Sequence, residues 1–249
     1  MAGRERIDKL LVTRGMVESR ERAQALVMAG RVFVKGQRVD KAGTPVALDA
    51  PIEVQGDACP YVSRGGLKLV GVLGPLGVDP QGRVCLDVGA STGGFTDVLL
   101  HAGASRVYAV DVGRAQLHER IRRDPRVIAH EGVNARLGLG EVVTEPVSLV
   151  VMDVSFISLT KVLPAVVAVL APEADVVAMV KPQFELSPQE VRGGVVRDDA
   201  LRDKAVRQVV AAAEALGMRL AGREDSPVHG PAGNREVFVR LGWKAPLGA

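Results

Sequence analysis

Residues 84–95 combine a short apolar run with a glycine-rich turn, a pairing that suits cofactor binding. The order Val-Cys-Leu-Asp-Val-Gly-Ala-Ser-Thr-Gly-Gly-Phe predicts a strand over 84–88, a turn at Gly89 and a helix from Phe95. In such a unit, backbone N–H groups and a helix N-terminus face the cofactor. The spacing Gly-x-x-x-Gly-Gly is not the Gly-x-Gly-x-x-Gly that a dinucleotide pyrophosphate needs. We expect an adenosine-containing cofactor other than NAD, with an ordinary βαβ turn as the alternative.

Polar residues also follow three further apolar runs. Asp111, Asp153 and Lys181 each come directly after a run that predicts a strand. Because ligands bind outside the carboxyl ends of parallel strands, we expect these side chains and Gly89 on one edge of a sheet. Asp111 can accept hydrogen bonds from ribose hydroxyls there. A single polar residue at a strand end is usually only solvated, but four on one edge predict a site.

Alternating strands and helices after residue 62 predict the sheet that positions these residues. We expect strands at 84–88, 107–110, 127–130, 147–152 and 175–180, and helices at 95–102, about 114–123, 160–170 and 198–216. Strands separated by helices form a mostly parallel sheet with helices on both faces. Two terminal strands, near 219–222 and 236–241, predict an antiparallel edge. The predicted fold class is α/β with a Rossmann-like sheet.

The N-terminal segment predicts a separate basic module. Residues 1–45 contain ten Lys and Arg against five Asp and Glu, a net +5, whereas the whole chain has +3. Two short helices, from Arg6 to Gly15 and from Ser19 to Gly30, precede a β-hairpin in this segment. Ser19 is the expected N-cap of the second helix. The charges are either a solvated surface or contacts to a polyanion such as RNA.

The length of 249 residues predicts two unequal domains. We place the small α+β domain at 1–57, a linker at 58–61 and the larger domain at 62–249. The longest uninterrupted apolar run, 165–171, is far shorter than the roughly 18 residues that cross a bilayer. No signal peptide is expected, so the predicted location is the cytoplasm, without a membrane partner. The two cysteines and four histidines show no ligand spacing, so no metal site is expected.

The motifs of the N-terminal module resemble the alpha-L RNA-binding module shared by a small-subunit ribosomal protein, pseudouridine synthases and tyrosyl-tRNA synthetases. The matching segments are Arg6-Ile-Asp-Lys-Leu-Leu11, Ser19-Arg20, Ala23-Gln-Ala-Leu-Val27 and Gly30-Arg-Val-Phe-Val-Lys-Gly36. The resemblance implies phosphate contacts by basic side chains and few stacked bases. The candidate RNA-binding residues are Arg6, Arg20, Arg22, Arg31 and Lys35, with Arg64 just past the linker.

Motifs in the larger domain, together with that module, make the chain similar to the TlyA/hemolysin A family. The motifs are Val62-Ser-Arg-Gly-Gly-Leu-Lys-Leu69, Asp87–Phe95, Asp111–Leu117, Asn134-Ala-Arg136, Met152–Ser158, Val180-Lys-Pro-Gln-Phe-Glu185 and Gly193–Asp198. The resemblance implies an FtsJ-like methyltransferase domain behind the RNA-binding module. It implies S-adenosylmethionine as cofactor and 2′-O-methylation of cytidine ribose in ribosomal RNA, with rRNA or a ribosomal subunit as partner.

The resemblance carries a Lys–Asp–Lys–Glu tetrad onto Lys68, Asp153, Lys181 and Glu236. A 2′-hydroxyl becomes a good nucleophile when its proton is removed or strongly polarised, and Lys181 is the implied activator. A lysine has a pKa of about 10.4 in water, so general-base action requires a pKa of about 7–8. In-line alignment of oxygen, methyl and sulfur is the other source of acceleration. The implied cofactor-binding residues are Gly89, Ala90, Ser91, Thr92, Gly93, Gly94, Phe95, Asp111, Val112 and Asn134.

Other functions fit parts of the sequence. An RNA-binding regulator with an inactive methyltransferase domain is one, although the tetrad is intact; a pore-forming hemolysin and an NAD-dependent oxidoreductase are the others. The chain ends soon after Trp243, where longer family members continue, so large-subunit rRNA is the expected substrate. The pair Gly65-Gly66 predicts a joint that lets Lys68 enter the site. The oligomeric state is left open.

Overall fold

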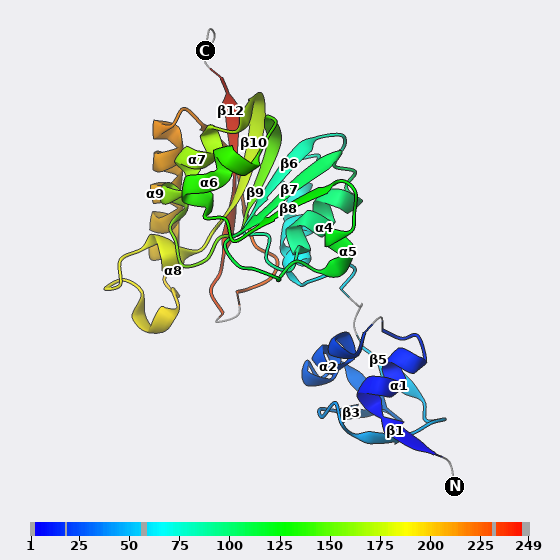
Figure 1. The fold of residues 1–249 in the computed structure, drawn as a ribbon. Coiled ribbons are helices and arrows are strands. Elements are labelled where there is room, and N and C mark those ends of the chain that lie inside the picture. The colour runs from blue at the N-terminus through cyan, green and yellow to red at the C-terminus, as the bar shows by residue number, and fades with distance from the viewer. Residues whose placement is uncertain (1–2, 18, 56–58, 231–232, 246–249) are drawn as a thin grey trace. The chain divides into compact units, whose positions relative to one another are not determined.

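The computed structural model describes residues 3–17, 19–55, 59–230 and 233–245 (Figure 1). The chain divides into two compact units, an N-terminal unit of residues 1–60 and a C-terminal unit of residues 61–249. The predicted linker, 58–61, begins at residue 58, which lies outside the described residues. The domain boundaries expected from the sequence therefore stay a prediction.

The N-terminal unit contains two helices and two small sheets. Its elements are β1 (Arg4–Arg6), α1 (Ile7–Thr13), α2 (Arg20–Met28), β2 (Val32–Val34), β3 (Gln37–Val39), β4 (Pro45–Ala47) and β5 (Ile52–Val54). Strand β2 pairs antiparallel with β3 and β5, and β1 pairs antiparallel with β4. The predicted helix pair and hairpin are confirmed. Ser19 caps α2 as expected, since its hydroxyl accepts the N–H of Arg22 at 3.2 Å.

The C-terminal unit alternates strands and helices. Its strands are β6 (Val84–Val88), β7 (Arg106–Asp111), β8 (Val127–Glu131), β9 (Val147–Met152), β10 (Leu170–Val180), β11 (Arg219–Asp225) and β12 (Val237–Lys244). Its helices are α3 (Gly65–Leu73), α4 (Gly94–His101), α5 (Glu119–Arg122), α6 (Ala135–Val142), α7 (Leu163–Val167), α8 (Pro182–Glu185) and α9 (Asp199–Ala215), with short 3₁₀ turns η1 (Leu159–Lys161) and η2 (Arg192–Gly194).

One seven-stranded sheet runs through this unit in the order β11-β12-β10-β9-β6-β7-β8. Strands β10, β9, β6, β7 and β8 are parallel. Strand β12 is antiparallel to both β10 and β11. The mostly parallel sheet with an antiparallel edge, predicted from the order of elements, is confirmed.

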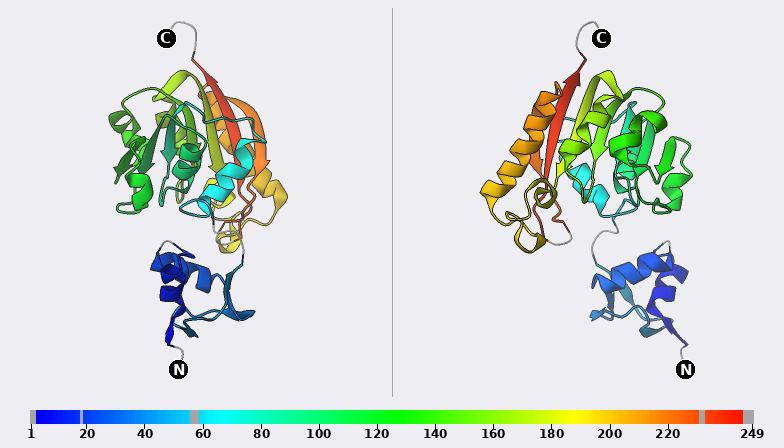
Figure 2. Two further views of the ribbon diagram at one scale, coloured as in Figure 1. Left: turned by 90° about the vertical axis from the view of Figure 1, so that its right-hand side faces the viewer. Right: turned by 60° about the vertical axis from the view of Figure 1, so that its left-hand side comes forward.

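Helices cover both faces of the sheet, as Figures 1 and 2 show. Alternate residues of each strand point to opposite faces, so neighbours such as Val150 and Val151 join different cores. One core contains buried residues of α6, α7 and α9, and the other contains buried residues of α3, α4 and α5. Buried on both faces, the central strands are almost wholly apolar. This rigid layer holds the strand ends that carry the polar residues.

Two predicted helices are shorter than expected. Only Glu119–Arg122 is helical within 114–123, because the Glu131 carboxylate accepts the N–H groups of Gln116 and Leu117 and holds that backbone in a loop. Within 160–170, η1 and α7 are separate, and Leu170 already pairs with Val147 in the sheet.

The predicted joint at Gly65-Gly66 is wrong. Both glycines form the first turn of α3, and Gly66 is buried. A Cβ on Gly66 would lie 2.6 Å from the Tyr61 side chain, so a close contact rather than freedom of movement explains this glycine. Lys68, three residues along the helix from Gly65, is therefore held by a regular element.

Candidate active site

Four predicted site positions lie at one edge of the sheet. Gly89 follows β6, Asp111 ends β7, Asp153 follows β9 and Lys181 follows β10. These four strands are neighbours in the order β10-β9-β6-β7 and run parallel. Their carboxyl ends therefore meet, as the sequence predicted.

The turn at Gly89 requires glycine. Its φ is +87°, and a Cβ there would lie 2.5 Å from the backbone oxygen of Asp153. The N–H groups of Gly89 and Ala90 both donate to the carbonyl of Val110, at 2.8 and 3.2 Å. These two amides shape the turn and hold it against β7. Helix α4 then begins at Gly94, after Gly93 with φ +95°.

Asp111 is fixed by the backbone around it. One carboxylate oxygen accepts the N–H of Ser91 at 2.8 Å, and the other accepts the N–H of Gly113 at 2.7 Å. A carboxylate oxygen can accept more than one hydrogen bond, so each keeps capacity for a hydroxyl group. Asp111 thus faces the turn after β6, in a position to bind a diol.

A cavity of about 480 Å³ opens beside Asp111, within the ~300–1,000 Å³ typical of small-molecule sites. Its lining includes Val88, Gly89, Ser91, Val110, Asp111, Val112, Gln116, Val133, Asn134, Ala135, Arg136, Asp153, Val154, Ser155, Phe156, Ile157 and Val162. The Asn134 side-chain oxygen accepts the N–H of Arg136 and caps α6. Its amide nitrogen keeps two N–H donors for a ligand.

A smaller pocket of about 120 Å³ adjoins this cavity and shares Gly89, Ser91 and Asp153 with it. Ser63, Gly65, Ala90, Thr92, Gly94 and Phe95 complete its lining. It connects the glycine turn to the start of α3, the helix that carries Lys68.

The four residues of the implied tetrad form two ion pairs. Lys181 Nζ lies 2.6 Å from Asp153 Oδ1, and Lys68 Nζ lies 2.5 Å from Glu236 Oε2. The Lys181 side chain is 10% exposed and that of Glu236 only 2%. Lys181 Nζ also donates to the Ser155 hydroxyl at 2.7 Å. Both pairs are largely removed from water, where charge interactions are strong.

Asp87 is a buried acid within β6, below the glycine turn. One of its carboxyl oxygens accepts the Thr96 hydroxyl at 2.7 Å, and the other has no hydrogen-bond partner among the described residues. Burial raises the pKa of Asp87 to about 7, and the negative charges of Asp153 and Asp111 add to this rise. The carboxyl beneath the site thus gains or loses its proton near neutral pH.

The loop after Asp153 presents an exposed aromatic ring. Phe156 is 91% exposed and has a φ of +63°, an unusual conformation for a bulky residue. Its ring lies 5.2 Å from that of Phe184, which follows Lys181 closely in the chain. The exposed ring of Phe156 therefore gives the cavity a flat apolar surface.

In the N-terminal unit, two of the predicted RNA contacts bind a buried acid. Arg6 and Arg20 both bind Asp8, at 2.9 and 3.0 Å, and Asp8 is fully buried. The Arg6 hydrogen bond, with help from Gln24 and Arg20, holds the pKa of Asp8 well below its usual range.

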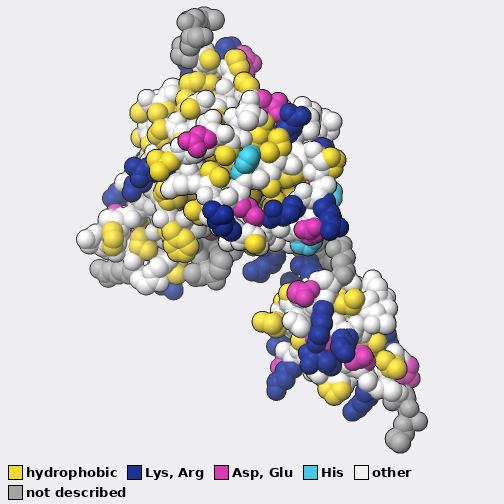
Figure 3. All heavy atoms as spheres, viewed as in Figure 1, with side chains coloured by type: hydrophobic (Ala, Val, Ile, Leu, Met, Phe, Trp, Pro, Cys, Tyr) yellow, Lys and Arg dark blue, Asp and Glu magenta, His cyan; other side chains and the backbone are white. Residues whose placement is uncertain are grey.

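The other basic candidates are more open. Arg31 and Lys35 are exposed, Arg22 is half-buried, and Arg64 is exposed at the N-terminus of α3. Figure 3 shows Lys and Arg side chains gathered on the visible face of the N-terminal unit.

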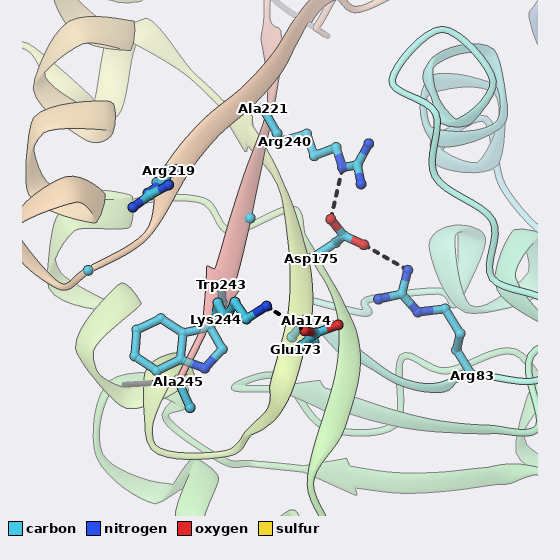
Figure 4. A pocket seen from close by; sticks show the side chains of 12 residues that line it. Arg83, Glu173, Ala174, Asp175, Arg219, Ala221, Arg240, Trp243, Lys244 and Ala245 are labelled. Atoms are coloured by element: carbon cyan, nitrogen blue, oxygen red, sulfur yellow. Dashed lines mark hydrogen bonds and ion pairs between the residues drawn. The ribbon is translucent and has the colours of Figure 1, made fainter. Parts of the chain in front are cut away.

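A larger cavity, about 810 Å³, lies at the opposite edge of the sheet (Figure 4). Asp175 sits between Arg83 and Arg240 there, at 2.9 and 2.8 Å, and Lys244 pairs with Glu173. These charges stabilise the amino ends of the parallel strands. The residues predicted to do chemistry are all at the other end.

Neither a membrane span nor a metal cluster is present in residues 3–17, 19–55, 59–230 and 233–245. No helix in these ranges is long and apolar enough to cross a membrane. No group of three or more His, Cys, Asp or Glu residues in them is arranged to hold a metal ion.

Four residues of the site are not singled out by the sequence. Ser155, Phe156 and Glu185 lie within longer motifs, and Asp87 lies within a predicted strand and the motif that begins there. Ser155 and Phe156 come two and three residues after Asp153, so their place in the chain is a usable signal. The Glu185 carboxylate accepts hydrogen bonds from Ser158 and Leu159, which lie 27 and 26 residues away, and no local pattern indicates these partners.

Family models match both units. Residues 61–243 match the FtsJ-like methyltransferase model, and residues 5–52 match the S4 domain. The 16S/23S rRNA (cytidine-2′-O)-methyltransferase TlyA of Mycobacterium tuberculosis is 46% identical over 97% of this chain and 91% of its own length. Hemolysin A of Brachyspira hyodysenteriae is 40% identical over 95% of this chain and 99% of its own.

A solved structure agrees with these matches. The "Putative hemolysin from Streptococcus thermophilus" is 39% identical, covers 98% of this chain and 90% of its own, and superposes with a TM-score of 0.77. The FtsJ-like methyltransferase model matches most of the chain, and the M. tuberculosis and B. hyodysenteriae proteins are 40% or more identical over nearly its whole length. This chain therefore belongs to the FtsJ-like methyltransferases, within the TlyA/hemolysin A family.

Proposed function

We propose that the protein transfers the methyl group of S-adenosylmethionine to the 2′-hydroxyl of a cytidine in ribosomal RNA. The ion pair of Lys181 with Asp153 beside the 480 Å³ cavity is the observation that carries this proposal. The M. tuberculosis relative is named for the same reaction. The intact tetrad favours an enzyme over an inactive RNA-binding regulator.

The residues around the cavity fit S-adenosylmethionine. Asp111 binds the ribose hydroxyls, Asn134 the polar edge of the adenine, and Val112 an apolar face. The glycine turn and the start of α4 accommodate the methionine part, with Gly89 and Ala90 shaping the turn. The contributing segment is Gly89, Ala90, Ser91, Thr92, Gly93, Gly94 and Phe95.

The cofactor supplies, when bound, a methyl group activated by its sulfonium. Lys181 Nζ activates the 2′-hydroxyl by holding or accepting its proton, while Asp153 and Ser155 fix the position of Nζ. Lys68 of α3 and Glu236, which directly precedes β12, form the second ion pair. Fixing the acceptor oxygen in line with the methyl group contributes up to about 7–11 kcal/mol.

RNA is bound by both units in this proposal. Arg22, Arg31 and Lys35 of the S4 domain contact phosphates, as do the remaining N–H groups of Arg6 and Arg20, and Arg64 does so beside α3. Phe156 offers its exposed ring to a base next to the reacting ribose, since stacking on an aromatic ring suits any base. The preference for large-subunit rRNA and a cytoplasmic location remain predictions.

Substitution of Lys181 tests the reaction. Lys181→Ala is expected to lower methyl transfer at least about 100-fold, because it removes the group next to the acceptor oxygen. Mapping of 2′-O-methyl groups on small- and large-subunit rRNA, with and without the protein, gives the position and the rate. Lys161→Ala, an exposed lysine in η1, is the matched control and is expected to keep the wild-type rate. A near wild-type rate for Lys181→Ala would remove this lysine from the chemistry.

Cofactor binding is tested separately by calorimetry. Asp111→Ala is expected to weaken S-adenosylmethionine binding by about 1–3 kcal/mol, the cost of losing hydrogen bonds to a charged acceptor. NAD is expected not to bind. Lys181→Ala is expected to bind S-adenosylmethionine as the wild type does, since its Nζ contacts Asp153 and Ser155 and not the ribose-binding acid. Unchanged affinity in Asp111→Ala would take Asp111 out of the site.

A further inference from the structure

We propose that Glu185 is a positioning residue for methyl transfer, which clamps the loop after β9 to the turn after β10. The inference rests on the proposed function, because these two segments carry Asp153 and Lys181. The hydrogen bonds of the Glu185 side chain go to Ser158 and Leu159 and not to Asp153 or Lys181, so Glu185 acts on the segments that hold these two residues.

The clamp consists of two hydrogen bonds made by one carboxylate. Glu185 Oε2 accepts the Ser158 hydroxyl at 2.5 Å, and Glu185 Oε1 accepts the Leu159 backbone N–H at 2.9 Å. Glu185 is the last residue of α8, which begins directly after Lys181. Both ends of the four-residue helix are therefore fixed, one by the sheet and the other by the neighbouring loop.

Two further contacts join the same segments. Lys181 Nζ donates to Ser155 Oγ, and the rings of Phe184 and Phe156 lie 5.2 Å apart. The loop from Asp153 to Leu159 is thus attached to the turn after β10 at its start, its middle and its end. Glu185 makes the attachment farthest from the lysine, where the loop enters η1.

The charge of Glu185 has no cation beside it. No ion pair joins its carboxylate to another described residue, so the partners are a hydroxyl and an amide. Burial raises the pKa of Glu185 despite those two hydrogen bonds. A partly buried acid that accepts hydrogen bonds only from neutral donors costs free energy, and the geometry it imposes is the compensating gain.

The expected consequence concerns orientation. Without the clamp, the loop that carries Asp153, Ser155 and Phe156 keeps its contacts with Lys181 and Phe184 but loses the attachment at its far end. Phe156, at φ +63°, is strained and depends on its surroundings to stay in that conformation. A displacement of the order of 1 Å at the reacting groups lowers a rate about 100-fold.

Glutamine at position 185 can preserve the clamp without the charge. Its side-chain oxygen accepts the Leu159 N–H, and its amide nitrogen donates to Ser158 Oγ, which in turn donates to Thr160 Oγ1, now 2.7 Å away. Alanine preserves neither bond. The two substitutions therefore separate the geometry from the charge.

The experiment compares Glu185→Ala and Glu185→Gln in the full-length protein. We expect kcat for rRNA methylation to fall about 10- to 100-fold in Glu185→Ala, with the Kd for S-adenosylmethionine changed less than about threefold, and to recover within about threefold of wild type in Glu185→Gln. Glu145→Ala is the matched control: this acid accepts hydrogen bonds from Tyr108 and Arg106 far from the site, and its loss is expected to leave kcat unchanged.

Amide hydrogen exchange reads the clamp without any substrate. The Leu159 N–H is expected to exchange faster in Glu185→Ala than in wild type or Glu185→Gln. The Val107 N–H of β7, which donates to the Arg126 carbonyl away from the clamp, is the internal reference. Unchanged protection of Leu159 in Glu185→Ala would overturn the clamp.

The kcat values of the two variants test whether Glu185 positions the reacting groups. Wild-type kcat in Glu185→Ala, or a loss that Glu185→Gln does not reverse, would overturn the positioning role. A wild-type protein that methylates no ribosomal RNA would instead overturn the proposed function, and with it the role in methyl transfer, while the exchange of Leu159 would still establish or refute the clamp.

Discussion

Three aspartates of this protein differ in their surroundings, and these surroundings set their charges. Asp8 is buried but binds two arginines and a glutamine, so it is held ionised. Asp153 pairs with Lys181 at the site. Asp87 is buried, accepts the Thr96 hydroxyl and has no cation beside it among the described residues, and its pKa rises to about 7. Burial alone therefore does not decide the state of a carboxyl; the donors around it do.

The burial of Asp87 predicts a pH-dependent stability. Its pKa rises from 3.8 to about 7 on folding, so the unfolded chain ionises first as pH increases. Stability is thus lost between about pH 4 and pH 7, by on the order of 4 kcal/mol relative to Asp87→Asn, which does not titrate. Urea unfolding from pH 5 to 8, followed by the fluorescence of Trp243, the single tryptophan, measures the part of this loss above pH 5, on the order of 3 kcal/mol.

An exposed acid gives the opposite trend and serves as the control. Arg223 lowers the pKa of Asp203 in the folded state, so its contribution is present above the unfolded pKa and is lost as pH falls. The difference in the free energy of unfolding between Asp203→Asn and wild type is expected to stay constant from pH 5 to 8. A constant difference between Asp87→Asn and wild type over the same range would show that Asp87 is ionised throughout.

At the scale of elements, the turn between β6 and α4 does more than connect them. Its glycine brings the backbone of one strand end against that of the next, where a Cβ would lie 2.5 Å from the Asp153 oxygen. The glycine turn after β6 and the loop after β9, which carry the proposed cofactor-binding and catalytic residues, are therefore packed against each other. A change in the first is expected to move the second.

Gly89→Ala tests this packing. The substitution places a Cβ at φ +87° and against Asp153, which costs about 1–3 kcal/mol of backbone strain and displaces the loop. We expect weaker S-adenosylmethionine binding by at least about tenfold and loss of methyl transfer. Gly82→Ala is the matched control, with φ +71° and no atom within 4 Å, and shows the strain alone. Equal effects of the two substitutions on cofactor affinity would mean that the contact with Asp153 is unimportant.

Over the whole molecule, the local excess of basic charge and the proposed cofactor site belong to different units. The N-terminal unit matches the S4 domain and holds a local excess of Lys and Arg, and the C-terminal unit holds the cavity and both ion pairs. RNA binding through phosphates releases counterions and weakens steeply with salt. The contribution of the N-terminal unit is therefore measurable through the salt dependence of RNA binding.

Removal of residues 1–60 tests the division. A protein of residues 61–249 is expected to bind S-adenosylmethionine with wild-type affinity but not to methylate rRNA at physiological salt. The slope of log K for RNA against log salt concentration is expected to fall by about one for each phosphate that the shortened protein no longer neutralises. Full activity with an unchanged slope would assign RNA capture to the C-terminal unit alone.

The sequence by itself determined the order of the strands in the C-terminal unit, four of its helices, the antiparallel edge and the edge of the sheet where the predicted site residues lie, but α3, α6 and α8 were not predicted. These features follow from local information: apolar runs bounded by turns predict strands, and parallel strands bring their carboxyl ends together. The match of motifs to a family added the tetrad and the cofactor. At 114–123 the predicted helix is shorter, because the Glu131 carboxylate at the end of β8 accepts the backbone N–H groups of Gln116 and Leu117.

Only the tertiary structure decided which side chains bind one another. Lys68 and Glu236 are separated by 168 residues, and no pattern along the chain pairs them. Arg6 and Arg20 carry the charge expected of RNA contacts, yet both bind the buried Asp8. Nothing in the sequence around Glu185 distinguishes it from other acidic residues, and only the structure shows its hydrogen bonds to Ser158 and Leu159. Such contacts depend on distances between elements, and these are set by the packing of the sheet and its helices rather than by neighbours in sequence.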